Sequence, residues 1–161
     1  MSARDKIMPC LWFDRQAEEA AKFYVSVFEN GRILDISHYD KGMHMPEGTV
    51  LTVIFEIAGR TIQALNGGPS FAFSEAVSLS IDCASQAEID DLWRKLTADG
   101  GSEGPCGWLK DKYGLSWQLV PSRLWQLVKD PDPAKTQRMW QALLQMKKLD
   151  IAKLEAAHAG E

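Results

Sequence analysis

The chain has 161 residues and a formal net charge of -4, with acidic and basic residues mixed along its length. Hydrophobic residues make up 45% and charged residues 25%, the composition of a globular protein with a full core. The absence of a basic run argues against nucleic-acid binding. No apolar run approaches the ~20 residues of a membrane span, and the N-terminus has no apolar signal core, so we expect a cytoplasmic protein.

The three cysteines are Cys10, Cys83 and Cys106, an odd number without C-x-x-C spacing. This pattern predicts free thiols in a reducing compartment. Each cysteine lies in or beside a predicted strand and has no neighbouring histidine in sequence. We therefore favour buried structural cysteines over nucleophiles.

The first half of the chain predicts one helix among four strands. An apolar stripe at helical spacing covers residues 17–28 and ends at Asn30-Gly31. Short apolar or alternating runs predict strands over 7–13, 32–39, 49–57 and 60–65. A loop over 40–48 holds His44, and His38 comes just before it.

The same order recurs about 70 residues later, which indicates an internal repeat. A strand is predicted over 76–82, followed by a helix that begins at a capping box of Ser85 and Glu88, in which the Glu88 side chain reaches back to Ser85. Gly100-Gly101 ends this helix, and a weak strand is predicted over 102–105.

A hairpin completes the second half. It consists of a short strand around Trp108, a turn over 111–114 and a strand over 115–120. Alternation in the last strand places Leu115, Trp117 and Leu119 on one face. Ser116 and Gln118 fall on the other face, which is either solvated or lines a cavity.

Two further helices are predicted in the tail. Asp132 followed by Pro133 is a helix start, and Asp150 caps a last short helix. We expect this helical pair to cover an open sheet edge or a partner subunit; a ligand-binding role is the alternative.

The doubled order of elements and several short stretches resemble the vicinal oxygen chelate superfamily, which includes glyoxalase I, extradiol dioxygenases and bleomycin-resistance proteins. Within it the chain is similar to the PhnB-like branch, often labelled 3-demethylubiquinone-9 3-methyltransferase. The matching stretches are residues 11–14, 48–52, 64–69, 78–83, 106–121 and 144–150.

The resemblance implies an α+β fold in which two β-α-β-β-β modules form a U-shaped sheet around a concave cup. We expect one domain over 1–129, with modules over about 5–69 and 74–122, and a helical tail over 130–161. It also implies a homodimer. A ferredoxin-like α+β dimer is the alternative fold, but it does not predict the doubled order.

Metal-dependent members hold a metal with four ligands from the first and last strands of each module. The resemblance places Pro9, Gln63, Ala76 and Gln118 at these positions. Proline and alanine have no donor side-chain atom, and carboxamides are poor ligands for transition metals. We therefore expect no metal cofactor, with Glu75, next to Ala76, as the one candidate ligand left open.

The cup that remains is neutral and polar, with no inward Lys or Arg, and it suits a small polar or aromatic ligand. Leu65 adds to its apolar wall. The residues predicted to line the cup are Gln63, Asn66, Ser78, Ser80, Ser116, Gln118, Leu11 and Phe13. The alternative is that these polar groups satisfy one another and buried water.

Three functions remain open: a metal-free binding protein, an enzyme of the same fold that uses Glu75, His38 or His44, and a structural protein without a ligand. We favour the first. The methyltransferase label has no support in the sequence, because no glycine-rich βαβ unit is present. His158 is expected to lie in a fraying tail. Of the tryptophans, Trp93 is expected in the core, and Trp108 and Trp117 either in the core or against a ligand.

Overall fold

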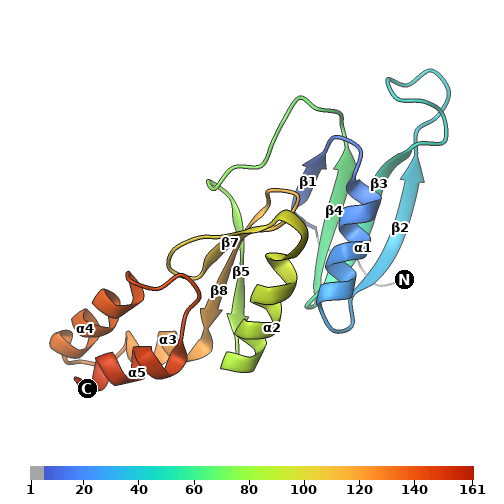
Figure 1. The fold of residues 1–161 in the computed structure, drawn as a ribbon. Helices are drawn as coiled ribbons and strands as arrows, with labels where there is room; N and C mark the ends of the chain where they lie inside the picture. The colour runs from blue at the N-terminus through green and yellow to red at the C-terminus, as the bar shows by residue number, and fades with distance from the viewer. Residues whose placement is uncertain (1–5) are drawn as a thin grey trace. The chain divides into compact units, whose positions relative to one another are not determined.

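The computed structural model describes residues 6–161, so the first five residues of the predicted domain lie outside the described part. The chain divides into two compact units, Met1–Ala72 and Phe73–Glu161. The described residues of each unit form a four-stranded sheet, and the two sheets have the same topology (Figure 1).

The first unit contains the predicted strand, helix and three further strands. In chain order they are β1 (Cys10–Phe13), α1 (Ala17–Val27), β2 (Arg32–His38), β3 (Val50–Ile57) and β4 (Arg60–Asn66). The strand order is β1-β4-β3-β2, with β1 parallel to β4 and the other pairs antiparallel. The prediction of a strand from residue 7 was too long, since Ile7 is 90% exposed and pairing begins at Cys10.

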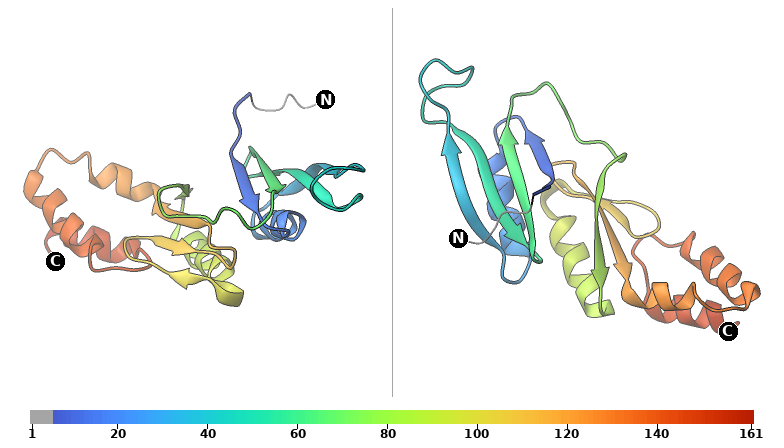
Figure 2. Two further views of the ribbon diagram at one scale, coloured as in Figure 1. Left: turned by 90° about the horizontal axis from the view of Figure 1, so that it is seen from above. Right: turned by 180° about the vertical axis from the view of Figure 1, so that it is seen from behind.

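Helix α1 covers one face of this sheet. Its buried stripe is rich in alanine, which lets the helix approach closely, and Tyr24 stacks on Phe55 of β3 with ring centroids 5.9 Å apart. The side chain of Asn66 accepts a hydrogen bond from the backbone N–H of Ala17 at 2.8 Å. This bond satisfies one of the free N–H groups at the start of the helix. Among residues 6–72 no helix covers the other face, which is turned toward the viewer in the right panel of Figure 2.

The second unit repeats this arrangement. Its elements are β5 (Ser78–Cys83), α2 (Gln86–Leu96), a single turn of 3-10 helix (Ala98–Gly100), β6 (Ser102–Glu103), β7 (Trp108–Lys110) and β8 (Ser116–Pro121). The strand order is β5-β8-β7-β6, with β5 parallel to β8. The predicted β-α-β-β-β repeat is therefore confirmed.

The predicted capping box at the start of α2 forms in part. The hydroxyl of Ser85 accepts from the backbone N–H of Glu88 at 3.2 Å. The carboxylate of Glu88 accepts from the N–H of Ala84 at 2.7 Å and not from that of Ser85. The return bond is displaced by one residue, yet it still satisfies a free donor ahead of the helix.

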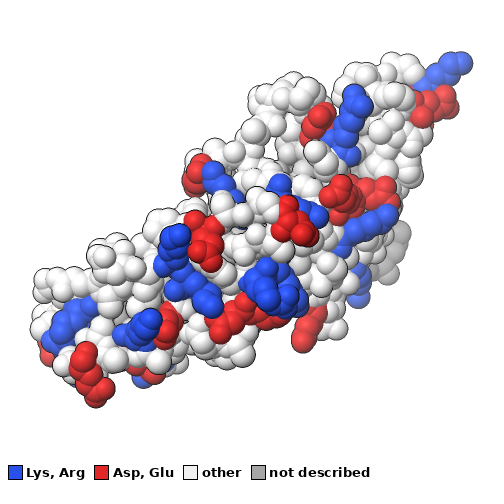
Figure 3. Space-filling view, in the orientation of Figure 1, with Lys and Arg blue, Asp and Glu red and all other residues white. Residues whose placement is uncertain are grey.

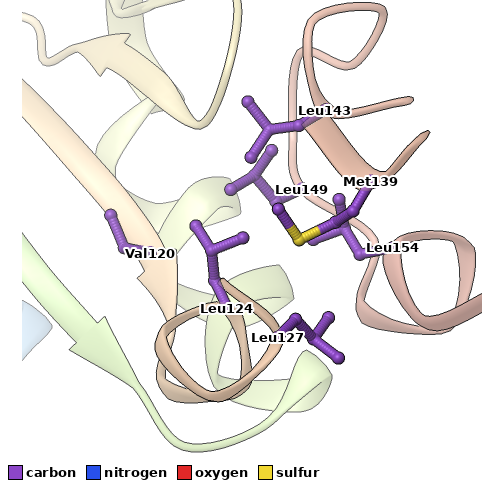
Figure 4. Packing of buried hydrophobic residues seen from close by; sticks show 7 residues of the cluster. All are labelled: Val120, Leu124, Leu127, Met139, Leu143, Leu149 and Leu154. Carbon is purple, nitrogen blue, oxygen red and sulfur yellow. The ribbon is translucent and has the colours of Figure 1, made fainter. Parts of the chain in front are cut away.

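Three helices follow β8 and belong to the second unit: α3 (Ser122–Leu127), α4 (Pro133–Leu143) and α5 (Ile151–Ala159). The last two begin as predicted, with the Asp132 and Asp150 side chains accepting from backbone N–H groups; α3 was not predicted. One buried cluster joins the three helices to β8, and its residues are Val120, Leu124, Leu127, Met139, Leu143, Leu149 and Leu154 (Figure 4). Within residues 6–161 the helices are too short or too polar to cross a bilayer.

The segment between α4 and α5 is also attached through its backbone. The N–H groups of Cys106 and Gly107 donate to the carbonyls of Met146 and Lys147, each at 2.7 Å. Gly107 has a φ of 82°, and a Cβ at this position would lie 2.8 Å from the carbonyl oxygen of Leu119. Only glycine fits this close approach without strain.

The turn between β7 and β8 depends on one buried carboxylate. Asp111 is 2% exposed, and its Oδ1 accepts from the N–H groups of Tyr113 at 2.9 Å and Leu115 at 3.1 Å. Its Oδ2 accepts from the indole N–H of Trp117 at 2.8 Å. Asp111 thereby joins the turn to a core residue of β8.

We predict that Asp111→Ala destabilises the protein by roughly 2–4 kcal/mol, because it leaves several buried donors without an acceptor. Urea unfolding followed by tryptophan fluorescence measures this change. Asp111→Asn retains one acceptor oxygen and should cost less. Glu47→Ala, in an exposed loop, is the control and should change the free energy of unfolding by less than about 0.5 kcal/mol. An unfolding curve of Asp111→Ala that matches the control would contradict this role of Asp111.

Candidate functional site

The uncovered face of the first sheet carries one of the predicted cup residues and one predicted wall residue. The register pairs Cys10 with Gln63 and Trp12 with Leu65, so these four side chains share a face. The carboxamide of Gln63 donates to the Sγ of Cys10 at 3.5 Å. The placement of Gln63 and Leu65 on the uncovered face follows the prediction.

Three other predicted cup residues lie on the opposite face. Leu11 pairs with Ala64 and Phe13 with Asn66, so all four point toward α1, where Asn66 bonds the first N–H of the helix. Leu11 and Phe13 are 5% and 4% exposed. Their assignment to a cup was wrong, because strand parity places them in the core under the helix.

In the second sheet the predicted polar residues do share one face. Ser78 pairs with Ser116, and Ser80 pairs with Gln118. The carboxamide of Gln118 donates to the hydroxyl of Ser78 at 2.8 Å. We call the face that carries these four residues the open face of the second sheet.

Two residues outside the predicted set of cup residues also lie on the open face; for Trp108 the sequence leaves both the core and a ligand contact open. Trp108 pairs with Gln118, and Lys110 pairs with Ser116. The prediction that the polar face has no inward lysine was therefore wrong. The predicted turn over 111–114 would pair Lys110 with Leu115, whereas the structure pairs it with Ser116.

A cavity of about 570 Å³ lies beside this part of the open face. It is lined by residues from β6, β7, β8 and the loops around them: Glu75, Ser102, Glu103, Gly104, Pro105, Cys106, Trp108, Leu109, Lys110 and Ser116. Ser116 is 1% exposed, and its hydroxyl oxygen has no hydrogen-bond partner among the described residues. A buried hydroxyl of this kind is costly unless something in the cavity bonds to it.

A carboxylate and an ammonium group meet at the cavity. The Nζ of Lys110 lies 2.5 Å from a carboxylate oxygen of Glu75, which precedes β5. The hydrogen bond from Lys110 holds the pKa of Glu75 below its ordinary value. Glu75, the one candidate metal ligand left open by the sequence, is thus bound to a lysine.

The four family metal positions do not fit a metal ion in this structure. Pro9 and Ala76 offer no donor side chain, and both precede the strands that were predicted to contain them. The amide nitrogens of Gln63 and Gln118 donate to Cys10 and Ser78, respectively. Across residues 6–161 no group of three or more His, Cys, Asp or Glu side chains is arranged to hold a metal.

None of the three histidines is among the residues that line the cavity. The Nε2 of His44 lies 3.2 Å from the Tyr39 hydroxyl, which donates to the carbonyl of Asn66 at 2.5 Å. His38 is exposed at the end of β2. His158, expected in a fraying tail, is instead 13% exposed and 3.3 Å from Asp130.

Two of the three tryptophans discussed above are core residues. Trp117 and Trp93 are 1% and 4% exposed, and their indole N–H groups donate to Asp111 and Glu103. The core assignment of Trp93 is confirmed. Trp108 is half-buried and lines the cavity.

The cysteines differ in their surroundings. All three are free; Cys83 is buried, Cys106 is half-buried and Cys10 is exposed. The prediction of a buried thiol therefore holds for Cys83 and was wrong for Cys10. Burial, with the nearby Glu88 and Asp82 carboxylates, raises the pKa of Cys83 to about 12, and burial also raises the pKa of Cys10.

The surface charges do not suggest a nucleic-acid site on the face shown in Figure 3. Lysine and arginine side chains lie next to aspartate and glutamate side chains across this face. Oppositely charged residues that form ion pairs include Lys148 with Asp90 at 2.5 Å and Arg123 with Glu155 at 2.6 Å.

The fold is that of the glyoxalase and bleomycin-resistance proteins of the vicinal oxygen chelate superfamily. A glyoxylase/bleomycin resistance protein/dioxygenase domain from Frankia superposes with a TM-score of 0.50 at 16% identity, covering 74% of this chain and 98% of the other. Protein PA1353 from Pseudomonas aeruginosa gives a TM-score of 0.60 at 18% identity, covering 74% and 98%.

The family is defined by two closer matches. The model of the 3-demethylubiquinone-9 3-methyltransferase family matches residues 5–120. The PhnB protein from Bacillus cereus is 36% identical over 73% of this chain and 99% of its own, with a TM-score of 0.64. The chain therefore belongs to this PhnB-like family. No curated protein matches it.

The ion pair of Glu75 and Lys110 can be tested by measuring the pKa of the Glu75 carboxyl. We predict a Glu75 pKa below the ordinary value of about 4.3, and a return toward that value in Lys110→Met. Because the folded-state pKa is lowered, the pair stabilises the fold above the unfolded pKa, and this contribution is lost as the pH falls through the folded pKa. Carbon-detected NMR of the side-chain carboxyl measures both pKa values. Equal pKa values in the two proteins would contradict the pairing.

The cysteines should differ in their rates of alkylation. We expect iodoacetamide at pH 8 to label Cys10 first and Cys83 last, since Cys83 is buried and has a pKa of about 12. Peptide mass spectrometry over a time course gives the order. Labelling of Cys83 before Cys10 under native conditions would contradict the burial of Cys83 and its raised pKa.

Proposed function

We propose that this protein binds a small polar or aromatic molecule at the open face of the second sheet, without a metal ion. The observation that carries the proposal is Ser116, a residue that lines the cavity and whose buried hydroxyl has no hydrogen-bond partner among the described residues. A ligand that bonds this hydroxyl would remove the cost of leaving it unsatisfied.

The composition of the cavity supports a ligand of this kind. Its volume of about 570 Å³ lies within the usual range of small-molecule sites. Ser116 and Lys110 supply polar contacts, while Trp108 and Pro105 supply apolar walls. A few polar groups in a mainly apolar cavity are typical of sites that orient one small molecule.

We do not propose methyl transfer for this chain on the strength of the family name. The described sheets each contain one parallel pair of neighbouring strands beside antiparallel pairs, unlike a doubly wound parallel sheet.

We also propose a homodimer, on the resemblance to a superfamily whose members usually dimerise. Sedimentation equilibrium measures the mass of the protein in solution, to be compared with the 18.0 kDa of one chain.

We predict that Ser116→Ala weakens binding of cavity ligands by tenfold or more. The ligands come from a fragment library screened by thermal shift and are then measured by calorimetry. Gln118→Ala should weaken binding less, because Gln118 lies one pair further along the face. The control is Ser26→Ala on α1, whose hydroxyl donates to the carbonyl of Phe23. Unchanged affinity in Ser116→Ala would show that the ligand does not bind in this cavity.

Metal content separates this proposal from a metal-dependent activity. After dialysis without chelator, the purified protein should contain less than about a tenth of an equivalent of any transition metal. Elemental mass spectrometry measures the content. Close to one equivalent of zinc, nickel or manganese would contradict metal-free binding.

A further inference from the structure

We propose that the cavity takes an aromatic carboxylate, whose carboxylate replaces Glu75 on Lys110 and whose ring lies against Trp108. This inference rests on the proposed binding function and names the class of ligand. It also makes Glu75 an internal competitor, a carboxylate that occupies the anion site when no ligand is bound.

The three contact groups lie on one face of the hairpin. Trp108 and Lys110 are two residues apart on β7, so both side chains leave the same side of the strand, about 7 Å apart. Ser116 lies directly across from Lys110 on β8. Facing side chains of this kind have Cβ atoms about 5 Å apart, so one carboxylate can contact both the ammonium and the hydroxyl.

At Lys110 the carboxylate of the ligand would replace the carboxylate of Glu75. The Glu75 side chain is 65% exposed and that of Lys110 is 39% exposed, so the pair is open to solvent. Exposed ion pairs add little to stability, because solvent screens the two charges, so Glu75 is readily displaced. A ligand carboxylate in its place keeps Lys110 neutralised and in addition accepts a hydrogen bond from Ser116.

The other acidic group at the cavity is already engaged. One carboxylate oxygen of Glu103 accepts from the indole N–H of Trp93 at 2.8 Å, and the other lies 3.7 Å from the Nζ of Lys147. These contacts reduce its repulsion of an incoming anion.

The ring site follows from the remaining walls. Trp108 is half-buried and lies next to Pro105 and Leu109 in the lining of the cavity. Aromatic rings favour offset or edge-to-face packing on an indole. An aromatic body joined to one carboxylate therefore matches both ends of the cavity.

The test uses 1-naphthoate, neutral 1-naphthamide and cyclohexanecarboxylate with the full chain, measured by calorimetry at low salt. We expect naphthoate to bind at least tenfold more tightly than either of the other two. Lys110→Met should abolish the preference for naphthoate over naphthamide. Glu75→Gln should tighten naphthoate binding about threefold or more, because the competing carboxylate is removed.

Matched controls come from the ion pair of Lys22 and Glu18 on α1, which are 2.7 Å apart. Lys22→Met and Glu18→Gln make the same chemical changes away from the cavity and should leave naphthoate affinity unchanged. Circular dichroism checks that each variant is folded. Glu75→Gln gives an independent readout, because its expected effect is a gain of affinity that unfolding does not produce.

The outcomes separate the two proposals. Equal binding of naphthoate and naphthamide, both weakened by Ser116→Ala, would overturn the carboxylate inference and leave the proposed function intact. Weaker naphthoate binding in Glu75→Gln would overturn the exchange on Lys110. If neither the three probes nor any library fragment bind in a Ser116-dependent way, both proposals are wrong.

Discussion

The register of the β7–β8 hairpin is the constraint on which the candidate site depends. A slip of β8 by one residue against β7 would turn Ser116 toward α2 and bring Trp117 to the open face, because successive side chains alternate. The carboxylate of Asp111 prevents such a slip, since it bonds both the turn and the indole of Trp117. One buried acid therefore sets which side chains reach the cavity.

The two units have the same topology, and in each the two faces of the sheet have different surroundings. In each, a helix covers an apolar face, and the other face carries the polar side chains. Polar groups on the uncovered face then bond one another, as Gln118 does with Ser78 and Gln63 with Cys10. Ser116 departs from this pattern, because its hydroxyl is buried without such a bond among the described residues.

The sequence predicts the repeat and most element boundaries, because helical stripes, capping residues and glycines are local signals. The helix starts at Asp132 and Asp150 are examples. Strand parity in the first unit could not be predicted in the same way. Leu11 and Phe13 are assigned to a face by their parallel pairing with β4, and that register depends on contacts distant in sequence. A strand buried on one face and half-buried on the other gives no clear alternation.

The open face of the second sheet was predicted better, since a hairpin fixes its own register. The predicted polar residues of β5 and β8 do share one face, yet Lys110 was missed there. Lys110 is assigned to this face by its pairing with Ser116. That pairing can be predicted only if the position of the turn is known to within one residue. The pocket itself depends on loops whose path no local pattern encodes.

The close approach at Gly107 has a consequence for variation among related chains. The family model ends at residue 120, and the Bacillus cereus protein aligns over 99% of its own length but 73% of this one. Yet the carbonyls of Met146 and Lys147, beyond the end of the family model, accept from the backbone N–H groups of Cys106 and Gly107, and Cys106 lines the cavity. A tail of different length or sequence would thus reshape this wall while leaving every strand in place, so the shape of the proposed binding cavity can change independently of the common fold.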